Sequence, residues 1–476
     1  MSCKRAYNES QLKFTILIFC ILLQLSLFPV FGANDSKKPN LILIVGDDLG
    51  YADLGVHGSK QIPTPNIDSI AKEGIIFTQA YVSSPVCSPS RAGLMTGKNQ
   101  LRFGFDNNLF PAPKGFDPDY VGLPLTEKTL ADKLKPLGYV NGLIGKWHLG
   151  EKPHFFPTKR GFDEFWGFLG GAHDYFNATP GETGMKCPIE CNYKTPADLT
   201  YITDDIGNEC VDFIKRHKKE PFFLFASFNA PHSPMQATEK DLKKFRHIED
   251  KLRRTYCAMV YRLDQNVGKI LKALKDEGLE RNSFVVFISD NGGPTSFNGS
   301  VNAPLNGQKT TCLEGGIRVP FIFKWPARFD AGKKIDSFVL SLDICPTFIK
   351  SAGGTISEKD KYKGVNTIPF LTGQTDKTPH PNVSMKWRYN VSAAIRDGDW
   401  KLIRLPDRLP MLFNLSDDIS EQNDLALQNL EKTRAMLKKL GTWDISLQHP
   451  VFVEPYWWRI GHLGLYDVEY QLVQPE

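Results

Sequence analysis

The sequence predicts an α/β fold with a large, mixed but mostly parallel sheet flanked by helices, followed by a smaller C-terminal α+β domain with an antiparallel sheet. Short apolar runs that end abruptly in polar residues predict strands buried on both faces: LILIV (41–45), FFLFASF (222–228) and FVVFIS (284–289). Amphipathic stretches predict the helices: 126–137, 198–218 and 251–277. Alternation of strands and helices is typical of parallel sheets, whose ligands bind outside the carboxyl ends of the strands.

The pattern changes after about residue 375. The run VSAAIRDGDWKLIRL (391–405) predicts a hairpin that turns at Asp397-Gly398-Asp399. A helix is expected near 425–440. We therefore expect one domain over 33–375 and a smaller one over 376–476.

The first 32 residues predict a cleaved signal peptide. A basic start is followed by the apolar run FTILIFCILLQLSLFPVFG, which ends in small residues. An uncleaved anchor helix is the alternative, but Gln24 and Pro29 disfavour it. No later run is long and apolar enough to span a bilayer, so no stable membrane insertion is expected after cleavage. Export to the lysosome or the cell exterior is expected, and a glycoprotein is predicted by the sequons at Asn34, Asn177, Asn298, Asn382, Asn390 and Asn414.

Charge and cysteine content narrow the function classes further. The formal net charge is only +5 and both signs are mixed along the chain, so a nucleic-acid partner is not expected. Two of the nine cysteines leave with the signal peptide. If Cys87 is set aside, an even set remains that could form disulfides of unknown connectivity: Cys187, Cys191, Cys210, Cys257, Cys312 and Cys345.

Acidic and amide side chains follow two of the predicted strands. Asp47 and Asp48 come directly after the first strand, and Asp290 and Asn291 follow the run at 284–289. Adjacent carboxylates repel each other unless a cation lies between them, and side-chain oxygens suit Ca²⁺ or Mg²⁺. The alternative is that these residues only cap helices and form turns.

The segment SSPVCSPSRAGLMTG (83–97) contains the cysteine that was set aside. Pro89 predicts a helix that begins just after Cys87, and free N–H groups at a helix N-terminus favour an anion. Arg91 lies one turn further on and adds a positive charge. These surroundings predict a lowered thiol pKa for Cys87. A buried or disulfide-bonded cysteine is the alternative.

Basic residues elsewhere complete a candidate site. In GYVNGLIGKWHLG (138–150), Lys146 and His148 are two residues apart, so in an extended segment both side chains face the same way. Such a pair can bind an anion and transfer a proton. His232 and Lys309 are weaker candidates on spacing alone, because a single histidine is more often structural.

These segments together resemble the type I, formylglycine-dependent sulfatases, of the arylsulfatase and N-acetylgalactosamine-sulfatase kind. CSPSRAGLMTG resembles the family signature Cys-x-Pro-Ser-Arg with a Leu/Met-Thr-Gly close. GYVNGLIGKWH is similar to the second signature, although Asn141 stands where Ser or Thr is usual. PNLILIVGDDLGYADLG and SDNGG are also similar to sulfatase segments. The resemblance runs from about Pro39 to Pro326 and implies an alkaline-phosphatase-like fold and a sulfuric ester hydrolase.

The resemblance also implies roles for the candidate residues. Cys87 would be oxidised during export to Cα-formylglycine (3-oxoalanine) by the formylglycine-generating enzyme. One calcium ion would be held by residue 87 together with Asp47, Asp48, Asp290 and Asn291. Arg91, Lys146 and His148 would hold and polarise the formylglycine, whereas His232 and Lys309 would contact the sulfate and assist the leaving oxygen. Related sulfatases often carry a polar residue where GGAHDYF has Ala172.

The implied mechanism uses the two hydroxyls of the hydrated aldehyde in turn. One attacks sulfur while Asp290 accepts its proton, and His232 protonates the leaving alcohol. His148 then deprotonates the second hydroxyl, and sulfate is eliminated as the aldehyde re-forms. The expected substrates are aryl sulfates or sulfated carbohydrates.

Three other functions stay open. They are a phosphoesterase or phosphonate hydrolase of the same superfamily, a non-catalytic carbohydrate-binding matrix glycoprotein, and a calcium-stabilised structural glycoprotein. The C-terminal PYWWRIGHLGLY (455–466) offers aromatic side chains that could stack on sugar rings, with domain packing as the alternative.

Overall fold

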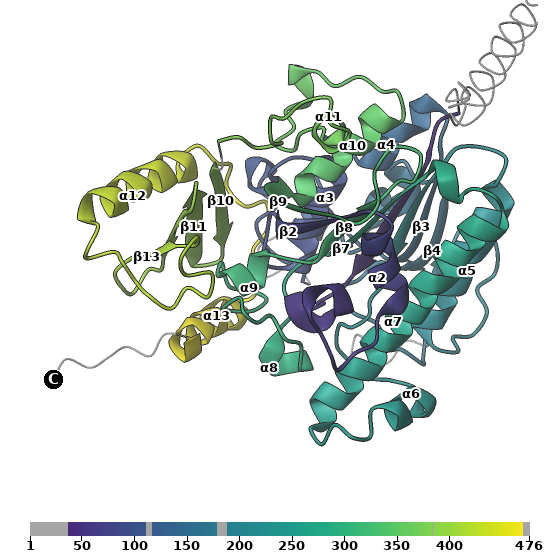
Figure 1. Ribbon diagram of the computed structural model, residues 1–476, viewed down its shortest axis with the longest axis horizontal. Coiled ribbons are helices and arrows are strands. Elements are labelled where there is room, and N and C mark those ends of the chain that lie inside the picture. The colour runs from purple at the N-terminus through teal and green to yellow at the C-terminus, as the bar shows by residue number, and fades with distance from the viewer. Residues whose placement is uncertain (1–36, 111–116, 179–187, 383, 470–476) are drawn as a thin grey trace, which may run out of the picture. The chain divides into compact units, whose positions relative to one another are not determined.

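The computed structural model describes residues 37–110, 117–178, 188–382 and 384–469 (Figure 1). The predicted signal peptide and Cys187 lie outside the described residues. All elements below belong to one unit of the chain, which begins at Pro39.

Nine strands form the main sheet in the order β5-β4-β3-β6-β1-β7-β8-β2-β9. They are β1 (Asn40–Gly46), β2 (Ile75–Tyr81), β3 (Val140–Lys146), β4 (Glu164–Phe168), β5 (Glu190–Cys191), β6 (Phe222–Ser227), β7 (Ser283–Ser289), β8 (Phe321–Lys324) and β9 (Lys333–Leu340). The pairs β4–β5, β7–β8 and β2–β8 are antiparallel. The four central strands, β3, β6, β1 and β7, are parallel to one another, which confirms the predicted mixed but mostly parallel sheet.

Helices cover both faces of this sheet, so the central strands are buried almost throughout. All seven residues of β1 are buried, and its side chains alternate between two hydrophobic clusters. Leu41, Leu43 and Val45 pack in the cluster that includes α3 (Cys87–Thr96), α4 (Leu130–Leu134) and α10 (Ile344–Ser351). Ile42 and Ile44 pack in the cluster of α2 (Pro65–Lys72), α5 (Ile202–His217) and α7 (Lys251–Asp276). The shorter helices are α6 (Glu239–Lys244), α8 (Thr295–Asn298), α9 (Glu314–Ile317) and α11 (Ile368–Leu371).

The C-terminal part contains a separate four-stranded antiparallel sheet, as predicted (Figure 1). Its strands are β10 (Ser384–Tyr389), β11 (Ser392–Asp397), β12 (Trp400–Arg404) and β13 (Met411–Asn414). The predicted hairpin is β11–β12, with Gly398 at its turn in the left-handed region at φ +63°. Helix α12 (Leu430–Asp444) packs on this sheet through Met436 and Leu440, and α13 (Tyr456–Glu469) follows it.

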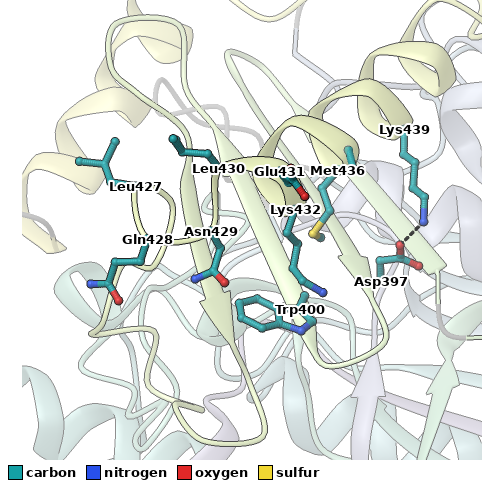
Figure 2. A pocket seen from close by; sticks show the side chains of 11 residues that line it. Asp397, Trp400, Leu427, Gln428, Asn429, Leu430, Glu431, Lys432, Met436 and Lys439 are labelled. Carbon is teal, nitrogen blue, oxygen red and sulfur yellow. Dashed lines mark hydrogen bonds and ion pairs between the residues drawn. The ribbon is translucent and has the colours of Figure 1, made fainter.

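A surface groove of about 740 Å³ runs along α12 in this C-terminal part (Figure 2). The ammonium group of Lys432 lies 4.5 Å from the centroid of the Trp400 ring, and Lys439 forms an ion pair with Asp397. None of the residues that the sequence predicts to act in catalysis or metal binding lines this groove. The groove is therefore not the candidate active site.

The described cysteines correct one expectation, because all six are free thiols: Cys87, Cys191, Cys210, Cys257, Cys312 and Cys345. The predicted pairing of the five that were expected to form disulfides is therefore wrong. Cys210 and Cys257 are buried in the cluster beneath α5 and α7, and Cys312 and Cys345 are buried in the other cluster. They pack as small apolar side chains.

Two further observations bear on export. Asn298 is only 1 % exposed and donates a hydrogen bond to the Asp48 carbonyl, so this sequon is not available to a glycan in the folded protein. Among the described helices, none combines the length and apolarity that crossing a bilayer requires.

A buried ion-pair network joins the antiparallel sheet to α9. The Lys401 ammonium, on β12, lies 2.9 Å from a Glu314 carboxylate oxygen and 2.8 Å from one of Glu421. All three side chains are fully buried. Burial alone would raise the pKa of Glu314, but Lys401 and Arg318 outweigh it and lower this pKa to about 2. Glu314 is therefore ionised and depends on Lys401 for its charge balance.

We expect Lys401→Met to lower the free energy of unfolding by about 3–5 kcal/mol, because the change removes the cation that contacts both buried carboxylates and leaves Glu314 only the more distant Arg318. Urea or thermal denaturation followed by circular dichroism measures this loss. The matched control is Lys439→Met, whose ion pair with Asp397 is solvent-exposed and is expected to contribute less than about 1 kcal/mol. Equal losses in the two variants would contradict a stabilising role for the buried network.

Candidate active site

The predicted site residues follow the four parallel central strands, each at the point where its strand ends. Asp47 and Asp48 follow β1, Asp290 and Asn291 follow β7, His232 follows β6, and Lys146 ends β3 with His148 just beyond it. Because the carboxyl ends of adjacent parallel strands meet at one edge of a sheet, these side chains converge there. Arg91 reaches the same place from α3, and Lys309 reaches it from a loop.

Buried ion pairs hold these side chains together. The Lys146 ammonium lies 2.6 Å from an Asp47 oxygen, and the Arg91 Nε donates to Asp290 at 2.8 Å. Lys309 lies 2.7 Å from Asp48. Arg91 also approaches Asp47 at 3.8 Å, and the His232 Nε2 is 3.5 Å from Asp48. Three carboxylates thus face three permanent cations, so this cluster is neutral when its histidines are neutral.

Cys87 is the first residue of α3, as the sequence predicted. Its side chain is 2 % exposed and its Sγ lies 3.5 Å from the Asn108 Oδ1, which also accepts a hydrogen bond from the Ser88 N–H at 3.0 Å. Burial raises the pKa of the Cys87 thiol, although Lys146 and Lys309 act to lower it. The expected lowered thiol pKa is therefore wrong, because desolvation of the thiolate outweighs the neighbouring cations.

Backbone strain is concentrated at this site. Six described residues other than glycine have positive φ, and three of them are Asp48 (φ 67°), His148 (φ 58°) and Thr310 (φ 78°). Such conformations cost about 1–3 kcal/mol each and persist where the surrounding structure fixes them. β3 ends at Lys146, so His148 reaches the site through this left-handed turn and not through the strand alternation that the sequence suggested.

Burial also sets the protonation of the two histidines. The pKa of His148 is well below its ordinary value because of burial, with Lys146 and Arg91 adding to the effect. Burial lowers the pKa of His232 as well, although Asp48 opposes it. Both imidazoles are therefore neutral near pH 7, and a neutral His148 can accept a proton.

The donor set fits a hard divalent cation. Among the described side chains proposed as metal ligands, two buried acceptor atoms accept no hydrogen bond: the Asp47 Oδ1 and the Asn291 Oδ1. Asp47, Asp48 and His232 also each place one potential ligand atom within 4.8 Å of the others. Unsatisfied buried acceptors are unfavourable, and a bound cation satisfies them. Asp48 and Asp290 are the weaker fits, because both oxygens of each already accept hydrogen bonds. Asp48 accepts from Asn291 and Lys309, and Asp290 accepts from Arg91 and the Asp48 N–H.

The site opens into a cavity of about 630 Å³. Cys87, Asp48, His148, His232 and Lys309 line one end of it. Asp47, Arg91, Lys146, Asp290 and Asn291 are packed behind this surface and are not among the lining residues. Ala172 also lines the cavity, whereas the neighbouring His173 is buried beside Phe168 and does not.

Sequence reasoning did not find Asn108, which binds the start of α3. The Asn108 N–H donates to a Glu454 oxygen at 2.7 Å, and the Tyr389 hydroxyl donates to the same oxygen at 2.8 Å. Asn108 follows no predicted strand and belongs to no quoted signature. Its contact with the start of α3 depends on Glu454, which is distant in the sequence and close only in the folded chain.

Fold and site together define a hydrolase of the alkaline-phosphatase-like class. The chain belongs to the sulfatase family: the sulfatase family model matches residues 39–354, and a model described as N-sulphoglucosamine sulphohydrolase, C-terminal, matches 308–442. The predicted family is confirmed, and the protein is a sulfuric ester hydrolase.

Individual relatives agree with this assignment. The chain is 33 % identical over 404 residues to the N-acetylgalactosamine-6-sulfatase of Mus musculus, covering 80 % of this chain and 75 % of the relative. It is 36 % identical over 401 residues to arylsulfatase J of Mus musculus, covering 79 % and 66 %. A crystal structure of Ps i-CgsB in complex with k-i-k-neocarrahexaose has 38 % identity, a TM-score of 0.82, and coverage of 90 % of this chain and 98 % of that one. The phosphonate monoester hydrolase of Agrobacterium radiobacter shares the fold, with 19 % identity, a TM-score of 0.62, and coverage of 85 % of this chain and 95 % of that one.

Proposed function

We propose that the protein hydrolyses sulfate esters of aryl or carbohydrate alcohols, using a Cα-formylglycine made from Cys87 and one bound calcium ion. The observation that carries this proposal is the position of Cys87. It lies at a helix N-terminus, at the end of a cavity, beside a neutral cluster of three buried carboxylates and three buried cations.

The calcium ligands we propose are Asp47, Asp48, Asp290, Asn291 and residue 87. Bound there, the ion would supply positive charge to polarise the sulfate oxygens. Without it the cluster is neutral, so a divalent ion makes it positive and attractive to the singly charged sulfate ester. The two unsatisfied acceptor oxygens, on Asp47 and Asn291, support this ligand set.

The modification of residue 87 is supported by the state of the thiol. Its pKa is raised by burial, so an unmodified Cys87 would be a poor thiolate nucleophile at neutral pH. Cα-formylglycine would instead supply a hydrated aldehyde, with two hydroxyls at the same carbon. We propose that the formylglycine-generating enzyme acts on the chain during export, along the route that the predicted signal peptide indicates, to the lysosome or the cell exterior.

The chain's own residues have separate tasks in this proposal. Arg91 and Lys146 fix Asp290 and Asp47 and hold positive charge behind residue 87. Burial and Asp47 raise the pKa of Asp290, which suits it to accept the nucleophile's proton. His148, neutral and on the cavity wall, is placed to accept the second proton.

Lys309 and His232 act at the leaving-group side. The pKa of Lys309 is raised because Asp48 outweighs the effect of burial, so its ammonium stays charged and binds the sulfate. His232 donates a proton to the departing alcohol. Because burial lowers its pKa in the free site, this donation depends on the negative charge of the substrate to raise that pKa again.

Comparing an aryl sulfate with the matching aryl phosphate and phosphonate tests the proposal. We expect kcat/KM to be highest for the sulfate, and a mass spectrum of the Cys87 peptide to show the mass of formylglycine. A higher kcat/KM for the phosphate or the phosphonate would indicate a phosphoesterase or phosphonate hydrolase of the same superfamily. Absence of all turnover in material that contains formylglycine would indicate a non-catalytic glycoprotein.

A further inference from the structure

Part of the cavity wall is built by helix α13, from the C-terminal part of the chain. Trp457, Trp458, His462 and Leu465 of this helix line the same cavity as Cys87 and Lys309. The space next to the sulfate-binding end is therefore continuous with the α13 surface, and the alcohol part of a bound ester must occupy it.

Aromatic contacts hold this wall in place. The Trp458 ring lies 5.4 Å from Phe110, and its indole N–H donates to the Tyr389 hydroxyl at 3.2 Å. The Trp457 ring packs edge-on against Trp458 at 5.7 Å, yet 66 % of Trp457 is exposed. Trp458 is therefore a packing residue, whereas Trp457 presents a large, uncovered aromatic surface beside the cavity.

A second exposed aromatic residue comes from a different element. Phe297 on α8 lines the cavity and is 68 % exposed. Its neighbour Asn298 is buried and donates a hydrogen bond to the carbonyl of Asp48, so the position of Phe297 is tied to the loop that carries the candidate metal ligands. Large exposed rings are unfavourable in water, and two of them beside one cavity indicate a ligand that covers them.

The charges of the lining residues restrict that ligand. Among the described lining residues Lys309 is the one lysine or arginine, and it lies at the sulfate end. The lining also supplies neutral polar groups, from Asn108, Ser233 and His462. An apolar wall with a few neutral hydrogen-bonding groups matches a sugar ring, which has an apolar C–H face and a rim of hydroxyls. Apart from Lys309, the described lining residues include no lysine or arginine that could neutralise a second anion.

We infer that Trp457 and Phe297 form the binding site for the sugar ring that bears the sulfate, and that this ring carries no second anionic group. This inference rests on the proposed function and adds the substrate class to it. Trp457 and Phe297 determine specificity through binding, and neither is placed to touch the reacting sulfur.

Binding can be measured apart from catalysis in the Cys87→Ala background, which cannot turn over. Isothermal titration calorimetry with a panel of hexose and N-acetylhexosamine monosulfates identifies the best ligand. We expect Trp457→Ala to raise its Kd about tenfold and Phe297→Ala to raise it several-fold, as the loss of aromatic stacking predicts. Trp457→Phe should restore most of the affinity. The matched control is Tyr120→Ala, which removes a side chain that is 69 % exposed and outside the cavity, and it should leave Kd unchanged.

Two results would overturn the inference. One is an unchanged Kd in both Trp457→Ala and Phe297→Ala. The other is a disulfated form of the best ligand binding tenfold tighter than the monosulfate, because that requires a second anion site. Hydrolysis of an aryl sulfate by the unmutated enzyme separately tests the proposed function. If the unmutated enzyme hydrolyses the aryl sulfate but neither substitution changes Kd, only the inference is wrong. If the substitutions raise Kd but no sulfate ester is hydrolysed, only the proposed catalysis is wrong.

Discussion

Replacing Cys87 with serine is expected to abolish sustained hydrolysis of sulfate esters, with a fall in kcat on the order of 10⁴-fold or more. A serine has one hydroxyl, so it can attack sulfur but has no second hydroxyl to expel sulfate from the same carbon. The side chain at position 87 is buried and meets Asn108, and serine is no larger than cysteine, so the fold should tolerate the change. Steady-state assays with an aryl sulfate measure the loss.

A second measurement separates this mechanism from a simple loss of binding. The serine variant incubated with substrate should gain the mass of one sulfo group on the peptide that contains residue 87. The control is Ser84→Ala, which removes a buried hydroxyl three residues before Cys87, outside the CSPSRAGLMTG signature, and should retain turnover. Full sustained activity in Cys87→Ser would be incompatible with the proposed nucleophile.

Asp47→Asn is expected to lower calcium content well below one ion per chain and to reduce kcat/KM by about 10²–10³-fold, the loss typical of removing one preorganised charge. The side chain keeps its shape but loses the negative charge that faces Lys146 at 2.6 Å and Arg91 at 3.8 Å. Those buried cations then repel a divalent ion. Metal analysis after dialysis, combined with steady-state kinetics, measures both effects.

The matched control is Asp53→Asn. Asp53 is also fully buried and paired with an arginine, Arg253 at 2.7 Å, but it is not one of the candidate calcium ligands. This variant should lose stability through its broken ion pair and still bind calcium. If Asp47→Asn kept its calcium, or if Asp53→Asn lost it equally, the assignment of Asp47 as a ligand would be wrong.

The middle of the main sheet was predictable because three short runs of the sequence are apolar and end in polar residues. LILIV, FFLFASF and FVVFIS became β1, β6 and β7, which lie side by side and parallel. That adjacency brings Asp47, His232 and Asp290 to one edge. Each of these short segments therefore predicts both a strand and the polar residue that follows its end.

Features that depend on distant segments were not predictable in this way. Asn108 matters because Glu454, far along the chain, accepts from its backbone. The pKa of Cys87 was misjudged because nearby charges can be read from a sequence, whereas complete burial of the thiol cannot. Pairing of the cysteines was expected from the exported context, but the fold distributes four of them within two separate hydrophobic clusters.

The link from Glu454 to Asn108 has a consequence for the order of events during biosynthesis. The ribosome makes Cys87 hundreds of residues before Glu454, so the start of α3 cannot obtain its final cover until translation is nearly finished. In the finished molecule Cys87 is only 2 % exposed. Any enzyme that modifies this residue must therefore act on the growing or newly released polypeptide, before its last segment docks.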